Sequence, residues 1–400
     1  MQTHPPVSRE PWVDALRVLA VLGVFIVNAM GYPFAPDYPV QAGAPQPADS
    51  TTAIVINGLL IAFVQSKAWP LLTFLFGYSL CSIALQSRAK GWVARDVLRL
   101  RYWKLLLVGV LHGALIYFGD VLTVYALCGL VAARWALLRP AQLLKVWKTV
   151  TIFFIISTVI YALLAVALLF FQNSPADASA QTIQTKMTLF AAPDITALLA
   201  LNMRTYFGNW LEVLIFLPFV FWLTVAGILA RRFQLLGNRR FAQWFWAKHL
   251  LIWQLFFALA FNVSLGLAAV QFHTLGSLHE NKLYGVSALS TSAGIWLAAC
   301  LLAWGMRRWH KRSALSPWVI WLAPAGRHTL AMYLWLSIVL MLSSHAFLGV
   351  SGSTPLRLGA VMLAWISVVC LARQASKLGM RDPIARWLSS ASVHKNQKTF

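Results

Sequence analysis

Side chains able to do chemistry are few in this sequence, and His112 is the sharpest candidate among them. It lies within the apolar run Val110-Leu111-His112-Gly113-Ala114, where an ionisable group is costly and therefore marks a functional candidate. A neutral imidazole can take a proton near neutral pH, which is the chemistry of a general base. The alternative is a histidine that is hydrogen bonded within the packed interior and has no chemical role.

Asp120 follows His112 by eight residues. On a straight helix the two would share a face at a separation of about 12 Å, which is too far for a direct hydrogen bond. The tight turn at Gly119 and the apolar run after it favour Asp120 as the cap of a helix that begins at Val121. A second role also remains open: Asp120 could orient His112, or the substrate group that gives its proton to His112, through water or a helix distortion.

Arg17 and Asn28 lie on nearly the same face of the first apolar run, about 16 Å apart along the helix axis. Either side chain could position a carbonyl group or stabilise developing negative charge, so both are candidates for the site. Arg17 has the alternative of extending to the membrane surface. Asn28 cannot act as a base, because its amide does not titrate near neutral pH.

Further candidates lie near the ends of apolar runs. Glu212 opens one run, where an acid also suits the first turn of a helix, and His345 lies late in another. The basic stretch 88–104 contains Arg99 and Arg101, which could hold the phosphates of a donor. Membrane topology alone also explains the charge of that stretch.

Metal sites and soluble-enzyme motifs are not expected. The four cysteines lie inside apolar segments without the paired spacing of metal ligands, so they are interpreted as packing residues. The sequence has no phosphate-binding glycine loop, no G-x-S-x-G elbow and no H-E-x-x-H pair.

The elements that must position these residues are membrane helices. The chain of 400 residues is 60% hydrophobic and 11% charged, whereas soluble domains carry about 25% charged residues. A bilayer can cover that much apolar surface. The net charge of +22 falls in short loops between apolar runs, which is typical of membrane topology, so nucleic acid is not an expected partner.

We predict an all-α polytopic membrane protein with about ten transmembrane helices and both termini in the cytoplasm. A single transmembrane domain, 12–372, lies between a cytoplasmic N-terminal tail, 1–11, and a cytoplasmic C-terminal tail, 373–400, and no cleaved signal peptide is expected. Run 51–65 is predicted to be a short interfacial or half-inserted helix on the outer face. The predicted spans are 12–31, 68–86, 103–119, 121–138, 147–171, 211–230, 249–270, 286–305, 320–348 and 356–372.

This topology places 28 of the 33 basic residues on the inner side, as the positive-inside rule requires. The outer side keeps Lys67, Lys186, Arg204, Lys282 and Arg357, and its longest loop is 172–210. The same topology puts Asn28, His112, Asp120, Glu212 and His345 in the outer half of the membrane, where they could converge on one polar cavity.

Five stretches in order resemble YeiB-like membrane proteins. They are the first helix from Val13 to Asn28, the segment Lys67–Gly77, the block 101–130 around Gly109-Val110-Leu111-His112 and Gly119-Asp120, the block 326–337 with Arg327 and Tyr333, and a degraded terminal motif at 381–387. That family is grouped with the acyltransferase-3 and heparan-glucosaminide N-acetyltransferase-like superfamily. Acyltransferase-3 proteins have ten helices and a first-helix signature of Arg, ten residues, then His. Here Arg17 keeps the spacing, but Asn28 replaces the usual histidine.

The resemblance implies an integral membrane acyltransferase. The expected donor is an acyl coenzyme A on the cytoplasmic side, and the acceptor a hydroxyl or amine of an envelope glycan or small molecule. His112, Asp120 and Asn28 are the predicted catalytic residues. Arg17, Arg99, Arg101, Glu212, Arg327 and Tyr333 are predicted to bind substrate, with no bound cofactor.

Two alternatives stay open. A transporter or flippase could use the same polar cluster as its binding site, and a non-catalytic membrane scaffold would need these residues only for stability. The lipid bilayer of a bacterial inner membrane is the expected surrounding, and a homo-oligomer is not excluded.

Overall fold

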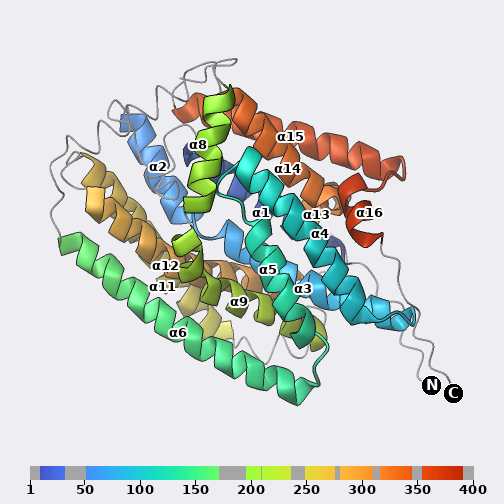
Figure 1. Ribbon diagram of the computed structural model, residues 1–400. Helices are drawn as coiled ribbons and strands as arrows, with labels where there is room; N and C mark the ends of the chain where they lie inside the picture. Colours follow the sequence, from blue (N-terminus) through green and yellow to red (C-terminus); the bar gives the residue numbers. More distant parts are fainter. Residues whose placement is uncertain are drawn as a thin grey trace.

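The computed structural model describes residues 10–31, 51–170, 195–208, 210–235, 248–274, 280–309, 316–344 and 354–390, and these ranges form helices and no strand (Figure 1). The helices are α1 (Pro11–Gly31), α2 (Thr51–Phe63), α3 (Ala68–Ala89), α4 (Ala94–Leu115), α5 (Leu122–Trp135), α6 (Pro140–Phe170), α8 (Ile195–Gly208), α9 (Trp210–Arg232), α11 (Lys248–Thr274), α12 (Glu280–Trp309), α13 (Pro317–Leu322), the 3₁₀ turn η4 (Ala325–His328), α14 (Thr329–Ser344), α15 (Thr354–Lys377) and α16 (Pro383–Ser389).

The helical, multi-pass character predicted from the sequence is confirmed. Each of the ten predicted spans coincides with a helix or a helical segment, and seven described stretches are long and apolar enough to cross a membrane. The count of ten and the cytoplasmic side of the termini stay predictions. Two spans differ in detail, because α4 ends at Leu115 instead of 119 and the span 320–348 is divided into α13, η4 and α14.

The outer surface of the bundle is suited to lipid. The long helix α6 runs along one flank and α15 along the opposite one (Figure 1), and α6 exposes apolar side chains such as Ile160 and Leu163 at more than half of their area. Exposed apolar surface on this scale is unfavourable in water and neutral in hydrocarbon. The exposed faces therefore support a membrane location independently of the helix lengths.

Glycines let the central helices cross closely. A Cβ at Gly77 of α3 would lie 2.0 Å from the carbonyl oxygen of Thr224 on α9, and one at Gly227 of α9 would lie 2.1 Å from the carbonyl oxygen of Phe74. Small residues at such crossings allow backbones to approach, which is the main source of helix association in membranes. This crossing holds α3 and α9 together in the centre of the bundle.

We expect Gly77→Ala to destabilise the protein by about 1–3 kcal/mol or more, because the added methyl group meets a backbone atom that cannot rotate away. Gly359→Ala on α15 is the matched control, since a Cβ there meets nothing within 4 Å. Thermal unfolding of both variants in detergent tests this. Equal melting temperatures would contradict the close α3–α9 crossing.

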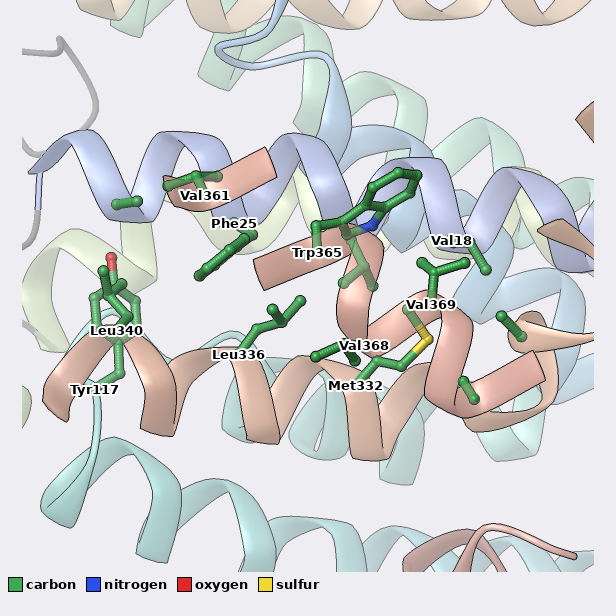
Figure 2. Packing of buried hydrophobic residues seen from close by; sticks show 14 of the residues in the cluster. Val18, Phe25, Tyr117, Met332, Leu336, Leu340, Val361, Trp365, Val368 and Val369 are labelled. Carbon is green, nitrogen blue, oxygen red and sulfur yellow. The ribbon is translucent and has the colours of Figure 1, made fainter. Parts of the chain in front are cut away.

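Helix α1 is held against the C-terminal helices by a large apolar cluster. Val18 and Phe25 of α1 face Met332 and Leu336 of α14, and Trp365 of α15 packs into the same cluster (Figure 2). The start of α1 is fixed by Glu10, whose carboxylate accepts a hydrogen bond from the Tyr78 hydroxyl of α3 at 2.7 Å. The polar end of α1 therefore lies beside the C-terminal half of α3.

Three segments add to a simple reading of the sequence. Helix α2, with 13 residues, is too short to cross a membrane by itself, and its Gly58 packs closely on Gly266 of α11; its interfacial position stays a prediction. The expected loop 172–210 contains helix α8. Helix α16, in the expected C-terminal tail, packs on α4 and α14, and Lys104 donates hydrogen bonds to the carbonyl oxygens of Trp387 and Ser390.

Candidate functional site

The end of α4 brings His112 and Asp120 into direct contact. After Leu115 the backbone N–H groups of Ile116 and Tyr117 both donate to the carbonyl oxygen of His112, which ends the helix and turns the chain back. The His112 Nδ1 and the Asp120 Oδ1 then lie 2.8 Å apart. The separation of about 12 Å expected for a straight helix is wrong, because the helix stops three residues after His112.

Asp120 also caps α5, as the sequence predicted. Its carboxylate accepts hydrogen bonds from the backbone N–H of Leu122 at 3.0 Å and from the N–H and hydroxyl of Thr123, both at 2.7 Å. These N–H groups would otherwise be unsatisfied at the helix start. Capping and contact with His112 are therefore two roles of one carboxylate.

Helix α8 supplies two residues that the sequence analysis missed. The Tyr206 hydroxyl lies 2.9 Å from the Thr123 hydroxyl, which extends the network beyond Asp120. The Asn202 amide donates to the carbonyl oxygens of Gly113 and Ala114 and accepts from the Phe118 N–H. The four-residue spacing of Asn202 and Tyr206 could have revealed a helix face in this stretch.

Glycines on either side of His112 explain how the neighbours come close. A Cβ at Gly109 would lie 2.5 Å from the Thr123 nitrogen at the start of α5, and one at Gly113 would lie 2.2 Å from the Tyr206 ring. Both residues are on α4, four positions apart. Only glycine at these positions lets α5 and α8 pack against the turn of the helix that carries His112.

The His112 and Asp120 side chains are buried, and their burial and partners bear on which of them donates the hydrogen bond. The side chains of His112 and Asp120 are 1% and 0% exposed. An ionised Asp120 carboxylate can only accept, and in that state Nδ1 of His112 carries the proton. Nε2 is then the basic nitrogen, and it has no hydrogen-bond partner among the described residues. This arrangement holds an imidazole in the tautomer that a general base needs.

Tyr333 of α14 separates this pair from a large cavity. Its ring centroid lies 5.1 Å from that of His112. Tyr333, Val121, Leu122 and Tyr125 line the inner end of a cavity of about 510 Å³. His112 and Asp120 do not line it themselves, so Tyr333 is the side chain that faces both the cavity and the imidazole.

The cavity extends from Tyr333 toward the end of the bundle where α1 begins and α3 and α9 end. Along α3 its lining runs from Leu72 to Gln86, a length of about 21 Å. Asp382, which caps α16, and Ala385 and Leu388 of α16 complete the wall. The cavity therefore opens among the basic helix ends, and the predicted convergence of Asn28, His112, Asp120, Glu212 and His345 on one outer cavity stays a prediction.

Four arginines line this cavity. Arg17 is paired with Asp14 and also donates to the Ser79 hydroxyl, and Arg231 donates to Glu10. Arg101 and Arg327 form no ion pair within 4.0 Å of a described carboxylate, although the Asp382 carboxylate on the same cavity attracts Arg101. Sequence analysis selected Arg17, Arg101 and Arg327 but missed Arg231, which was counted only as a topology charge.

Gly326 positions Arg327. A Cβ at Gly326 would lie 2.4 Å from the carbonyl oxygen of Asp14, so η4 packs directly on the first turn of α1. The Thr329 hydroxyl donates to the Gly326 carbonyl oxygen at 2.6 Å and stabilises this turn. The turn thus places Arg327 on the same cavity as Arg17.

Two other predicted site residues, Asn28 and Arg99, are not brought to the cavity. Asn28 is half-buried on α1, lines neither of the two cavities described here, and makes no side-chain hydrogen bond to a described residue. Arg99 is exposed and absent from the cavity lining. The Glu212 side chain and His345 lie outside the described part of the chain. Within the described ranges no group of three ligand-type side chains could hold a metal ion.

Comparison with known proteins gives partial matches. The chain is 30% identical to the uncharacterized protein YxaH of Bacillus subtilis (strain 168) over 142 residues and 34% identical to the uncharacterized protein YeiB of Escherichia coli (strain K12) over 141 residues. A 39.9 kDa protein from Bacillus acidopullulyticus is 29% identical over 119 residues. The matches cover about a third of this chain and about a third of each relative.

These matches support the YeiB-like resemblance found in the sequence, at the level of distant similarity to bacterial proteins. No family model matches the chain, and no solved structure matches it. Membership of the acyltransferase superfamily stays a prediction.

Proposed function

We propose that the protein is a membrane acyltransferase of the bacterial inner membrane that moves an acyl group from acyl coenzyme A to a hydroxyl or amine. The observation that carries this proposal is the buried His112–Asp120 pair directly behind Tyr333, at the inner end of an arginine-lined cavity. A base, a hydrogen-bond donor and an anion-binding approach are the three parts that acyl transfer from a phosphorylated donor needs.

The donor enters the cavity from the basic helix ends, which the positive-inside rule assigns to the cytoplasm. Arg101 and Arg327 hold its phosphates, because these guanidinium groups have no ion pair with the described residues. The cavity length of about 21 Å along α3 lets an extended pantetheine arm reach Tyr333 from there. The thioester carbonyl then lies against the Tyr333 hydroxyl.

The transfer step uses three groups. Since Tyr333 separates His112 from the cavity, the Tyr333 side chain must move so that the acceptor reaches the His112 Nε2. This nitrogen then removes the proton from the acceptor hydroxyl or amine as that oxygen or nitrogen attacks the thioester carbonyl carbon. The Tyr333 hydroxyl donates to the oxyanion that forms, and Asp120 stabilises the imidazolium. When the carbon–sulfur bond breaks, the thiolate of coenzyme A leaves and takes the proton from His112. The products are the acylated acceptor and free coenzyme A.

The basic test is release of coenzyme A. Purified protein in nanodiscs is incubated with labelled acyl coenzyme A and candidate hydroxyl and amine acceptors, and the free thiol and the acylated acceptor are measured together. Acceptor-dependent thiol release at a rate well above that without protein is the expected result. Movement of an acceptor across vesicles without thiol release would favour the transporter alternative and exclude this proposal.

Donor binding gives a sharper test. We expect Arg101→Gln combined with Arg327→Gln to raise KM for acyl coenzyme A by roughly 10²–10⁴-fold, since each of the two charge-assisted hydrogen bonds contributes about 1.5–3 kcal/mol. The short donor S-acetyl-N-acetylcysteamine lacks the phosphates, so its KM is expected to stay unchanged. Arg99→Gln is the matched control because Arg99 is exposed outside the cavity. An equal KM change for both donors would remove these arginines from phosphate binding.

A further inference from the structure

A buried lysine, Lys67, lies at the break between α2 and α3. Helix α2 ends at Phe63, and the chain turns through Ser66, whose φ is 59°, before α3 begins at Ala68. Lys67 is only 7% exposed, and its Nζ donates to the carbonyl oxygen of Ile61 at 2.7 Å. The break is therefore packed inside the bundle, and the outer side predicted for Lys67 stays a prediction.

The packing around the break confirms its position between helices. A Cβ at Gly294 of α12 would lie 2.3 Å from the carbonyl oxygen of Ser66. On the other side, a Cβ at Gly23 of α1 would lie 2.5 Å from the Ala68 side chain. The turn is thus held between α1 and α12, about 18 Å along the axis from the start of α1.

Lys67 has no anionic partner in the described part of the chain. One carbonyl oxygen accepts from its ammonium group, which has three donors, and no described carboxylate lies within ion-pair distance. Charges at membrane depth are usually paired, because an unpaired buried charge costs several kcal/mol. Capping the last carbonyl groups of α2 accounts for only one of the three donors.

Lys67 lines an apolar cavity. This second cavity, of about 380 Å³, lies between α1, the α2–α3 break, α12 and α13, and Lys67 is the one ionisable residue among the described residues that line it. Along α1 its lining runs from Trp12 to Ile26, about 21 Å. Leu16 and Gly23 of α1 face this cavity, whereas Asp14 and Arg17 face the arginine-lined one. Helix α1 therefore separates two independent sites.

We propose that this cavity binds a single-chain amphiphile with a carboxylate head, of the long-chain fatty acid class. The carboxylate pairs with the Lys67 ammonium group, and the hydrocarbon chain lies along the apolar walls formed by α1 and α12. A single ammonium group matches a singly charged head, whereas a phosphate would need more donors than this cavity offers. The volume lies near the lower end of the range for small-molecule pockets and suits one chain.

The test measures binding of radiolabelled hexadecanoate to the full chain in detergent, with hexadecanol as the uncharged probe of equal length. Wild type is expected to bind hexadecanoate saturably at one site. Lys67→Met keeps an apolar stem and removes the charge, so it is expected to weaken hexadecanoate binding about tenfold or more while leaving hexadecanol binding unchanged. Equal hexadecanoate affinity in wild type and Lys67→Met would show that Lys67 only caps α2 and would overturn the proposal.

A second variant tests the cavity without touching Lys67. Ala298→Trp on α12 fills the apolar cavity, and it is expected to abolish binding of both probes. Leu363→Trp is its control, because Leu363 is exposed on α15 outside the cavity. If Ala298→Trp still binds hexadecanoate as the wild type does, the fatty acid binds outside this cavity and the proposal fails. This conclusion does not depend on whether Lys67→Met folds.

Discussion

Replacing His112 with Ala is expected to lower the rate of acyl transfer by about 10²–10⁴-fold, because that is the usual contribution of a positioned general base. The substituted side chain removes the only base in the buried pair while the cap of α5 by Asp120 remains. The measurement is coenzyme A release per purified molecule at saturating donor. The change should appear in kcat, with little change in KM, since His112 does not line the donor cavity.

A second variant separates chemistry from stability. His112→Asn keeps a side-chain N–H that can donate to the Asp120 carboxylate, but its amide cannot take a proton near neutral pH. We expect a similar loss of turnover with a melting temperature closer to that of wild type than His112→Ala shows. Turnover by folded His112→Asn within twofold of wild type would exclude His112 as the base.

Substitution of Asp120 is the second change with a large expected effect. Asn is also a good helix cap, so in Asp120→Asn the amide oxygen can still accept from the N–H and hydroxyl of Thr123, while the hydrogen bond from the Leu122 N–H is lost. The Asn amide can, however, donate to Nδ1 of His112, which places the proton on Nε2 and leaves no base at that nitrogen. An inverted tautomer of this kind costs up to about 10⁴-fold in kcat in serine-protease triads. We expect a loss of 10²–10⁴-fold here with a small change in melting temperature.

Asp120→Ala provides the comparison. It removes hydrogen bonds to two backbone N–H groups and the Thr123 hydroxyl together with the contact to His112, so both activity and stability should fall, the latter by about 1–3 kcal/mol. The informative quantity is the ratio of the two effects. If Asp120→Asn turns over normally and only Asp120→Ala is impaired, then Asp120 is a structural cap without a role in orienting His112.

The membrane architecture could be predicted from the sequence because it depends on short-range properties. Apolar runs of about 20 residues and the placement of Lys and Arg in loops predicted helical segments that coincide with the structure. His112 and Asp120 were selected for the same kind of reason, since an ionisable residue within an apolar run is costly wherever it folds. Neither inference required knowledge of which helices touch.

The direct contact of His112 with Asp120 could not be predicted, because it depends on where α4 ends. Nothing in the local pattern stops the helix at Leu115, and the turn is fixed by Asn202 of α8, 84 positions from the Phe118 whose N–H it accepts. The same limit applies to Arg231 and to Lys67. Each looks like an ordinary topology charge until the packing of distant helices places it in a cavity wall.

By itself, then, the sequence determined that this chain folds as membrane helices. It also identified the few ionisable residues whose burial within apolar runs costs enough free energy to require a structural or functional role. The tertiary structure alone decided which of those residues meet: it joined His112 to Asp120 and gathered Arg17, Arg101, Arg231 and Arg327 around one cavity, and it left Asn28 and Arg99 off that cavity. The physical reason is that hydrophobicity and charge act residue by residue, whereas contacts across a bundle depend on where helices end and how closely their glycines let them approach.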